Sequence, residues 1–149
     1  MKKVLLVLAI GISMGAAAQI KSLGQLPKYE RVGIARQGPT ITIAELSVSA
    51  DTNYMISYFN NKYPSLNRYE IISFSASKED IEALYLAFKN AFTSKDIREY
   101  DEVLTLSKDW MGIGGGKLLG LKHVTITGEK GRSLPMTENQ VDKLFGKNK

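Results

Sequence analysis

Few residues of this sequence belong to the types that perform catalysis. His123 is the only histidine among the 149 residues, and there is no cysteine. A Ser-His-Asp triad would depend on His123, but the chain from residue 29 onward has no Gly-x-Ser-x-Gly turn to present a serine nucleophile. The lack of cysteine excludes thiolate nucleophiles and thiolate metal sites. We therefore expect no metal and no cofactor, and interpret His123 as a half-buried structural residue.

Paired carboxylates are the remaining catalytic option. Asp101, Glu102 and Asp109 are close in the sequence, and two carboxyl groups suffice to hydrolyse a glycosidic bond. The chain has 15 aspartates and glutamates, so some acids fall near one another without a catalytic role. The acids from Asp96 to Glu102 do not have the spacing of an EF-hand calcium loop. A small carboxylate-based hydrolase that acts on glycans is one alternative function.

A glycine-rich stretch, residues 108–116 (KDWMGIGGG), has the composition of a phosphate-binding loop without its spacing. A P-loop requires glycine five residues before Gly116, where this chain has Met111. The G-x-G-x-x-G pattern of dinucleotide sites also fails, because Lys117 stands where the third glycine belongs. We predict that the stretch is a flexible hairpin loop and not a phosphate site.

The same stretch contains Trp110, the only tryptophan. Trp110, Met111 and Lys117 would suit contact with a partner, because large amphipathic side chains beside an adaptable loop often carry binding energy. Trp110 is equally suited to anchoring a core at the end of a strand. An inhibitor or immunity-type protein that inserts the 108–116 loop into another enzyme's cleft is a second alternative function.

Tyrosines are numerous, with seven in the chain. Tyr54 and Tyr58 fall on one face of a predicted strand, and Tyr63 follows closely in the sequence. An aromatic and basic sheet face can stack sugars or bases. We interpret these three tyrosines as a candidate surface for a partner protein or a glycan, and a role in the core and its rim is the alternative.

The first residues, MKKVLLVLAIGISMGAAAQ, have the three parts of a secretory signal peptide in order. Lys2 and Lys3 are followed by an apolar segment and by an A-x-A cleavage motif at residues 16–18. The segment resembles signal peptides of Gram-negative export, which implies a periplasmic or extracellular protein. We expect cleavage after Ala18, no transmembrane anchor afterwards and no nucleic-acid partner. Cleavage would lower the formal net charge from +5 to +3, because two lysines are removed.

The clearest helix is predicted for residues 77–92, SKEDIEALYLAFKNAF. Ser77 suits the N-cap and Asp80 the reciprocal position of a capping box. The apolar residues recur with helical spacing and form one stripe, which must be buried: Ile81, Leu84, Tyr85, Phe88, Ala91 and Phe92. The preceding strand is the nearest candidate to cover it, and Leu86 is expected to be exposed.

Strand-like segments surround this helix. We predict strands at residues 29–36, 40–49, 54–61, 69–76, 103–107 and 117–127, a hairpin loop at 50–53 and a β-bulge near Ala44 and Glu45. A second, shorter helix is predicted at 138–145, with Thr137 and Gln140 as its capping box and Gly146 at its end. The two helix starts align, either through convergent capping or through an internal repeat of strands followed by a helix.

Together these features predict an α+β protein. After a signal peptide (1–18) and a flexible leader (19–28), residues 29–149 should form one domain. Its antiparallel sheet should have about five to seven strands, largely in a meander, with the long helix on one face and the short helix at the C-terminus. By elimination, we expect an exported, non-enzymatic binding or accessory protein that contacts a protein or a glycan in the cell envelope or outside the cell.

Overall fold

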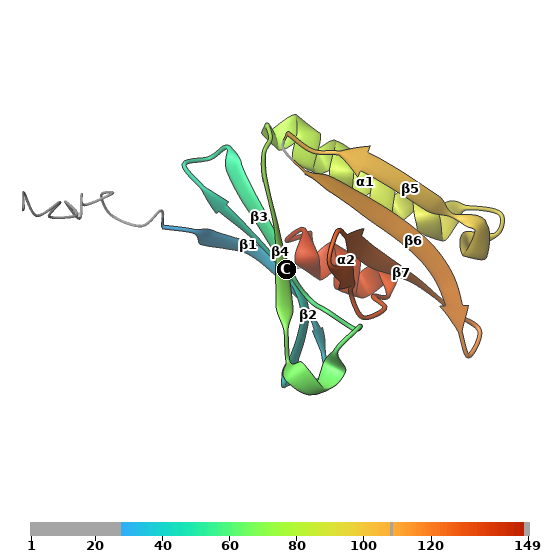
Figure 1. The fold of residues 1–149 in the computed structure, drawn as a ribbon. Coiled ribbons are helices and arrows are strands. Elements are labelled where there is room, and N and C mark those ends of the chain that lie inside the picture. The colour runs from blue at the N-terminus through green and yellow to red at the C-terminus, as the bar shows by residue number, and fades with distance from the viewer. Residues whose placement is uncertain (1–27, 108, 148–149) are drawn as a thin grey trace, which may run out of the picture.

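The computed structural model describes residues 28–107 and 109–147. Within these residues the strands form two four-stranded antiparallel sheets, with the orders β1-β2-β3-β4 and β5-β6-β7-β8 (Figure 1). The predicted α+β class is confirmed, although the strands divide between two sheets and not one. The expected signal peptide and nearly all of the expected leader lie outside the described residues.

The first sheet consists of β1 (Glu30–Gln37), β2 (Ile41–Ser49), β3 (Asn53–Phe59) and β4 (Tyr69–Ser75). Its loop at 50–53 is the predicted hairpin, and Ala50 and Asp51 there adopt φ values of 51° and 61°. The register of β1 and β2 shifts opposite Thr42–Ala44, so the irregularity lies just before the predicted bulge. A short 3-10 helix, η1 (Pro64–Leu66), connects β3 to β4.

The second sheet consists of β5 (Asp101–Thr105), β6 (Trp110–Leu118), β7 (Leu121–Gly128) and the short β8 (Gly131–Arg132). Two sequence predictions are wrong here. The glycine-rich stretch is not a flexible loop, because residues 110–116 are the first seven residues of β6. They pair with β5 on one side and with β7 on the other. Residues 117–127 are not one strand, because the chain turns at Leu119 and Gly120, where φ is 49° and 82°.

Close packing explains the glycines of β6. A Cβ atom on Gly115 would lie 2.1 Å from the carbonyl oxygen of Ile97, in the short 3-10 helix η2 (Ile97–Glu99). A Cβ atom on Gly116 would lie 2.5 Å from Nε2 of His123 on β7. Because Gly115 and Gly116 have no side chains, η2 and the His123 ring can approach the backbone of β6 at these two positions.

Helix α1 (Lys78–Thr93) begins at the predicted capping box. The backbone N–H of Asp80 donates to Oγ of Ser77 at 3.1 Å, and the N–H of Ser77 donates to the Asp80 carboxylate at 2.9 Å. The Asp80 carboxylate accepts one hydrogen bond from the Ser77 backbone N–H and one from the Ser77 hydroxyl, and both lower the pKa of Asp80. Most of the predicted stripe is buried, and Leu86 is exposed as expected.

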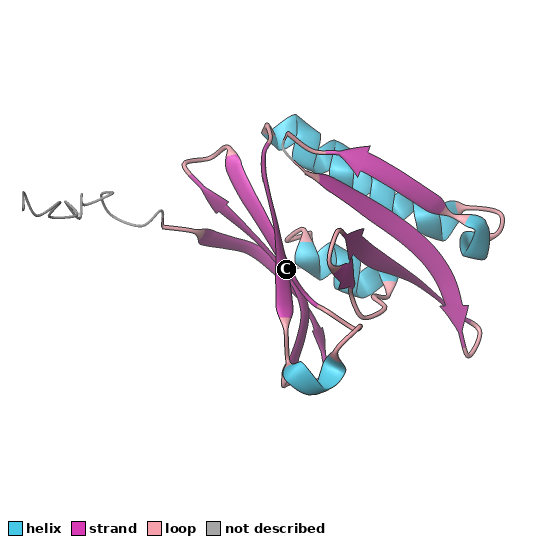
Figure 2. Cartoon of the chain, in the orientation of Figure 1, coloured by secondary structure: helices cyan, strands magenta, loops and turns pink. Residues whose placement is uncertain are grey.

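Helix α2 (Glu138–Leu144) follows β8, so four strands followed by a helix occur twice in the described chain. Each helix packs mainly on the sheet of the other half. Helix α1 contacts β6 and β7, and not chiefly the preceding β4 as predicted, whereas α2 contacts β1 and lies between the two sheets (Figure 2). The element order repeats, as an internal repeat would require, and the exchange of helices ties the halves together.

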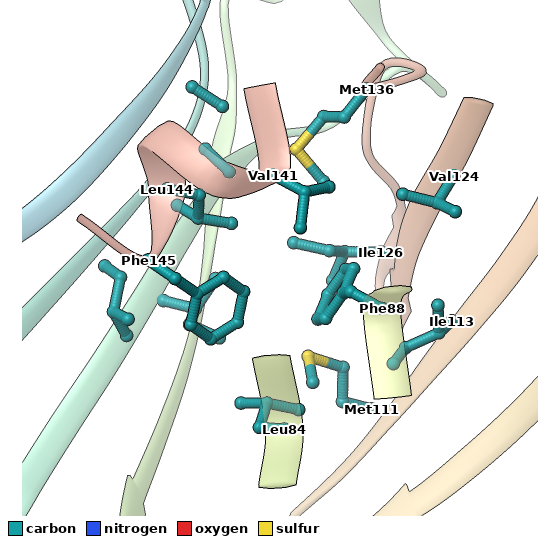
Figure 3. Close-up of a cluster of buried hydrophobic side chains, with 14 of the residues drawn as sticks. Leu84, Phe88, Met111, Ile113, Val124, Ile126, Met136, Val141, Leu144 and Phe145 are labelled. Atoms are coloured by element: carbon teal, nitrogen blue, oxygen red, sulfur yellow. The ribbon is translucent and has the colours of Figure 1, made fainter. Parts of the chain in front are cut away.

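The core lies where these elements meet. Phe145, just after α2, packs its ring against Phe88 and Tyr85 of α1, with ring centroids 5.5 Å apart in both pairs. Buried residues from β6, β7 and both helices converge on this cluster (Figure 3). One apolar cluster of buried residues spans both sheets, and this arrangement fixes which side chains remain available at the surface.

Candidate binding surfaces

The six residues predicted to contact a partner are dispersed over the molecule. Met111 is fully buried in the core, and Tyr58 is almost so. The Tyr58 hydroxyl donates to the carbonyl oxygen of Gly131 at 3.2 Å, and burial is the main cause that raises the pKa of Tyr58 to about 12. These two side chains therefore serve the packing of the two sheets in this structure.

The other four predicted residues differ in their environments. Tyr54 is buried and stacks on Phe74 with ring centroids 6.0 Å apart. Tyr63 is exposed beside η1, where the ammonium group of Lys62 lies 5.4 Å from its ring centroid. Trp110 and Lys117 occupy opposite ends of β6 and, seven residues apart in a strand, point to opposite faces. The structure therefore does not gather the predicted residues into one site.

A hollow of about 290 Å³ lies at the end of the first sheet that carries the β2–β3 turn. Eight residues line this serine hollow: Tyr29, Ser49, Asn53, Tyr54, Ser73, Phe74, Ser75 and Ser107. Of the predicted binding residues, only Tyr54 is among them. These serines were not predicted as site residues, because the only feature that marks them in the sequence is the alternation of small polar residues along β2 and β4.

The serine hollow is built across three strands. Ser49 pairs with Asn53, and Asn53 pairs with Ser75, so the three side chains lie in one cross-strand row. The Ser75 hydroxyl donates to Oδ1 of Asn53 at 3.1 Å, and the Ser75 backbone N–H donates to the Ser107 hydroxyl at 3.3 Å. The hydroxyls of Ser49 and Ser73 make no hydrogen bond within the described residues; Ser73 is exposed and can reach a ligand, whereas Ser49 is largely buried.

The chemistry of the serine hollow suits binding. Its lining combines the exposed ring of Tyr29 with hydroxyl and amide groups and contains no charged residue and no histidine, whereas the rings of Tyr54 and Phe74 are buried on the other face of the sheet. A serine needs an adjacent base to become a nucleophile, and no lining residue can act as one. A neutral ligand with hydroxyl groups would find partners for hydrogen bonds and an apolar surface for its ring faces.

A second hollow, of about 470 Å³, is charged and lies between α1, α2 and the start of β7. The Lys89 ammonium group donates to the carboxylates of Glu138 at 2.5 Å and Asp142 at 3.1 Å. Partial burial alone would lower the pKa of Lys89, but the hydrogen bonds to these two acids raise it to about 12. Three of the four charged residues of this hollow are therefore paired with one another, and Lys122 donates to the carbonyl oxygen of Phe92, which favours a structural role in joining the two helices.

The carboxylates considered for glycoside hydrolysis do not converge. Asp101 and Glu102 are consecutive in β5 and so point to opposite faces of the sheet. Glu102 accepts a hydrogen bond from the Tyr100 hydroxyl, and Asp109 accepts one from the backbone N–H of Trp110 at 2.9 Å. This geometry does not support a pair of catalytic carboxyl groups.

Metal ligation finds no support in residues 28–107 and 109–147. No group of three or more histidine, cysteine or acidic side chains is placed there to hold a metal ion. His123 is half-buried, as expected, and its Nδ1 has no hydrogen-bond partner among the described residues. Its ring covers the bare backbone of Gly116, so packing accounts for its position.

Three exposed leucines lie together at the β6–β7 turn. Leu118, Leu119 and Leu121 are 60%, 95% and 68% exposed. This group of exposed leucines was not predicted from the sequence, because residues 117–127 were expected to form one continuous strand. Gly120 was the available turn signal.

Comparisons with family models, with curated proteins and with solved structures find no match to this chain. Neither of the two helices in the described part of the chain combines the length and the apolar character needed to cross a bilayer.

Proposed function

We propose that this chain is a small, exported, non-enzymatic binding protein that acts in the cell envelope or outside the cell. The serine hollow is the observation that carries the proposal. It offers hydrogen-bonding groups from β2, β3 and β4 beside the exposed ring of Tyr29, without a charged residue in its lining. Export rests on the sequence of the first 18 residues, which has the order of a signal peptide.

Between a protein and a glycan as the ligand, the serine hollow favours a glycan. Sugars present hydroxyl groups at their edges and apolar C–H groups on their ring faces. The exposed Ser73 hydroxyl and the polar side chains of Asn53 and Ser75 match the edges, and the half-exposed ring of Tyr29 can stack on a face. The absence of charge in the lining favours a neutral glycan over an acidic one.

Binding of neutral oligosaccharides, measured by calorimetry, tests the proposal. We expect Tyr29→Ala to weaken binding about 5- to 150-fold, because stacking on an aromatic ring contributes about 1–3 kcal/mol. Tyr63→Ala is the matched control: Tyr63 is 42% exposed, close to the 37% of Tyr29, but lies beside η1 and outside the hollow.

Three results would contradict the proposal. Equal effects of Tyr29→Ala and Tyr63→Ala would show that the serine hollow is not the binding site. Release of cleaved sugars, lost in Asp101→Asn or Glu102→Gln, would instead identify the carboxylate-based hydrolase. Tight inhibition of a co-exported enzyme with no effect of Tyr29→Ala would identify an inhibitor, which would have to use a surface other than the glycine-rich stretch because that stretch is β6.

A further inference from the structure

The end of the β6–β7 hairpin departs from the usual chemistry of a two-residue turn. Leu119 and Gly120 both have positive φ, a conformation for which asparagine, aspartate and glycine are the favoured residues at the first position. Leucine in this left-handed conformation is strained, because its Cβ approaches the backbone. The same leucine is also the most exposed large apolar side chain among the described residues, at 95%.

The neighbouring residues add two more unfavourable features. Leu118 and Leu121 face each other across the hairpin and are both exposed. Lys117 and Lys122 form the next cross-strand pair, and like charges in direct opposition destabilise a hairpin. We name residues 118–121 the leucine tip, and Lys117 with Lys122 the lysine pair. Within the described chain, no contact offsets the strain and the exposure of the leucine tip. Local features that are unfavourable for folding are expected at functional sites, so we look for a role in contact with another molecule.

A carboxylate lies near one member of the lysine pair: hydrogen bonds from Arg98 chiefly lower the pKa of Asp96, and the charge of Lys117 adds a smaller effect. Lys122 donates to the carbonyl oxygen of Phe92 at 2.5 Å, near the end of α1, and forms no salt bridge there. Lys117 likewise has no salt bridge. The nearby carboxylate of Asp96 is bound to Arg98 through two side-chain hydrogen bonds, at 2.9 and 3.1 Å. The hairpin therefore presents an apolar end with positive charge directly behind it.

We propose that the leucine tip docks on a membrane that contains anionic phospholipids. Its three leucines enter the interfacial region of the bilayer, Lys117 contacts the lipid phosphates, and Lys122, held on the carbonyl oxygen of Phe92, adds positive charge behind the leucines. The spacing fits this arrangement, because Lys117 is two positions before the most exposed leucine, Leu119, a rise of about 7 Å along an extended chain. Peripheral segments bury their apolar groups about 5–10 Å into the same region. This inference goes beyond glycan binding and does not depend on the serine hollow.

A bilayer fits the leucine tip better than a second copy of the chain does. A stable protein interface buries about 800 Å² on each partner, well beyond three leucines at the end of a hairpin. Two copies in contact through their tips would also bring their lysine pairs together. A membrane accepts an isolated apolar projection and supplies the phosphate groups that the lysines lack.

Binding of the full-length chain to vesicles, measured by flotation, is the first part of the test. Vesicles of phosphatidylglycerol mixed with phosphatidylcholine should bind the chain, and phosphatidylcholine alone should bind it more weakly. Leu119→Asn should reduce the affinity for the anionic vesicles about tenfold, because one exposed leucine no longer leaves water. Lys117→Gln should reduce it about fivefold. Leu66→Asn, at an exposed leucine of η1, is the matched control and should leave it unchanged.

Leu119→Asn has a further advantage. Asparagine tolerates the left-handed backbone better than leucine, so this variant should melt at a higher temperature than the parent. A loss of vesicle binding together with a gain in thermal stability cannot result from misfolding.

A local probe, the second part of the test, separates the leucine tip from the apolar first residues, which would also bind vesicles. The chain contains no cysteine, so Leu119→Cys and Leu66→Cys each give one site for a polarity-sensitive fluorophore. With anionic vesicles, the emission at position 119 should shift to the blue and be quenched by lipid-borne quenchers, whereas position 66 should not respond. Equal responses at both positions, or no response at 119, would overturn the proposal. So would a response at 119 that depends on protein concentration without lipid, because it would show self-association.

Discussion

Gly33 of β1 is the position at which the docking of α2 on the first sheet is most sensitive to substitution. A Cβ atom on Gly33 would lie 2.2 Å from the carbonyl oxygen of Lys143 and 2.4 Å from that of Leu144. Both distances are at least an ångström short of ordinary contact, which begins at 3.4 Å, and both neighbours are backbone atoms that no side-chain rotation can remove. Gly33→Ala must therefore push the end of α2 away from β1.

The expected cost follows from this geometry. Overpacking of this kind destabilises a protein by about 1–3 kcal/mol. Alanine restricts the unfolded chain more than glycine does, which offsets about 0.5–1 kcal/mol of that cost. We expect a net loss of about 1–2 kcal/mol in the free energy of unfolding, measured by urea denaturation with an unchanged slope.

Gly114→Ala is the matched control on the second sheet. Its Cβ would lie 3.2 Å from Oγ1 of Thr125, which donates to the carbonyl oxygen of Gly114 at 3.3 Å and would have to shift by only a few tenths of an ångström, so stability should fall by less than about 1 kcal/mol. If Gly33→Ala were as stable as the parent, α2 would not rest on β1 in the way described, and the exchange of helices between the two sheets would be wrong.

Two further predictions concern the core and the acid stability of the fold. Phe88→Ala should reduce the free energy of unfolding by about 3–5 kcal/mol, because the ring is fully buried against Phe145, whereas Leu86→Ala on the exposed side of α1 should change it by less than about 0.5 kcal/mol. A lower pKa in the folded than in the unfolded state means that ionised Asp96 stabilises the fold, and hydrogen bonds from Arg98 lower its pKa to about 2. This contribution is complete above the unfolded value of about 4 and is lost as the pH falls towards 2, so the melting temperatures of the parent and Asp96→Asn should converge over that range, and parallel curves would contradict it.

The helices were predictable from the sequence because their signals are local. The capping box of Ser77 and Asp80 sits within four consecutive residues, and the apolar stripe of α1 repeats with the period of the helix itself. The end of α2 was also predictable from a local signal. Gly146 adopts a positive φ of 66°, a conformation that favours glycine just after a helix.

The second sheet was not predictable in the same way. Glycine has no preference for strands, so the composition of β6 indicated a loop. Its glycines are explained only by elements that are distant in the sequence or across the sheet, since Ile97 and His123 occupy the space that side chains at Gly115 and Gly116 would need. The turn at Leu119 lacked the usual Asn-Gly signal and was read as strand.

The candidate site depended on the same long-range information. Alternation along one strand places Tyr54 and Tyr58 on one face, but cannot tell whether that face meets solvent or a second sheet. Once the second sheet covers it, both tyrosines are buried, and the opposite face of β2–β4 presents the row of Ser49, Asn53 and Ser75. The serine hollow exists because three strands align there, which no single segment reveals.

The central claim is that the serine hollow binds a neutral glycan, and amide chemical-shift mapping by nuclear magnetic resonance tests it most directly. Titration of the isotope-labelled protein with neutral oligosaccharides should shift the amide signals of Ser49, Asn53, Ser73 and Ser75 and leave those of the leucine tip unchanged. Shifts confined to other surfaces, or no shifts at millimolar sugar, would contradict the claim.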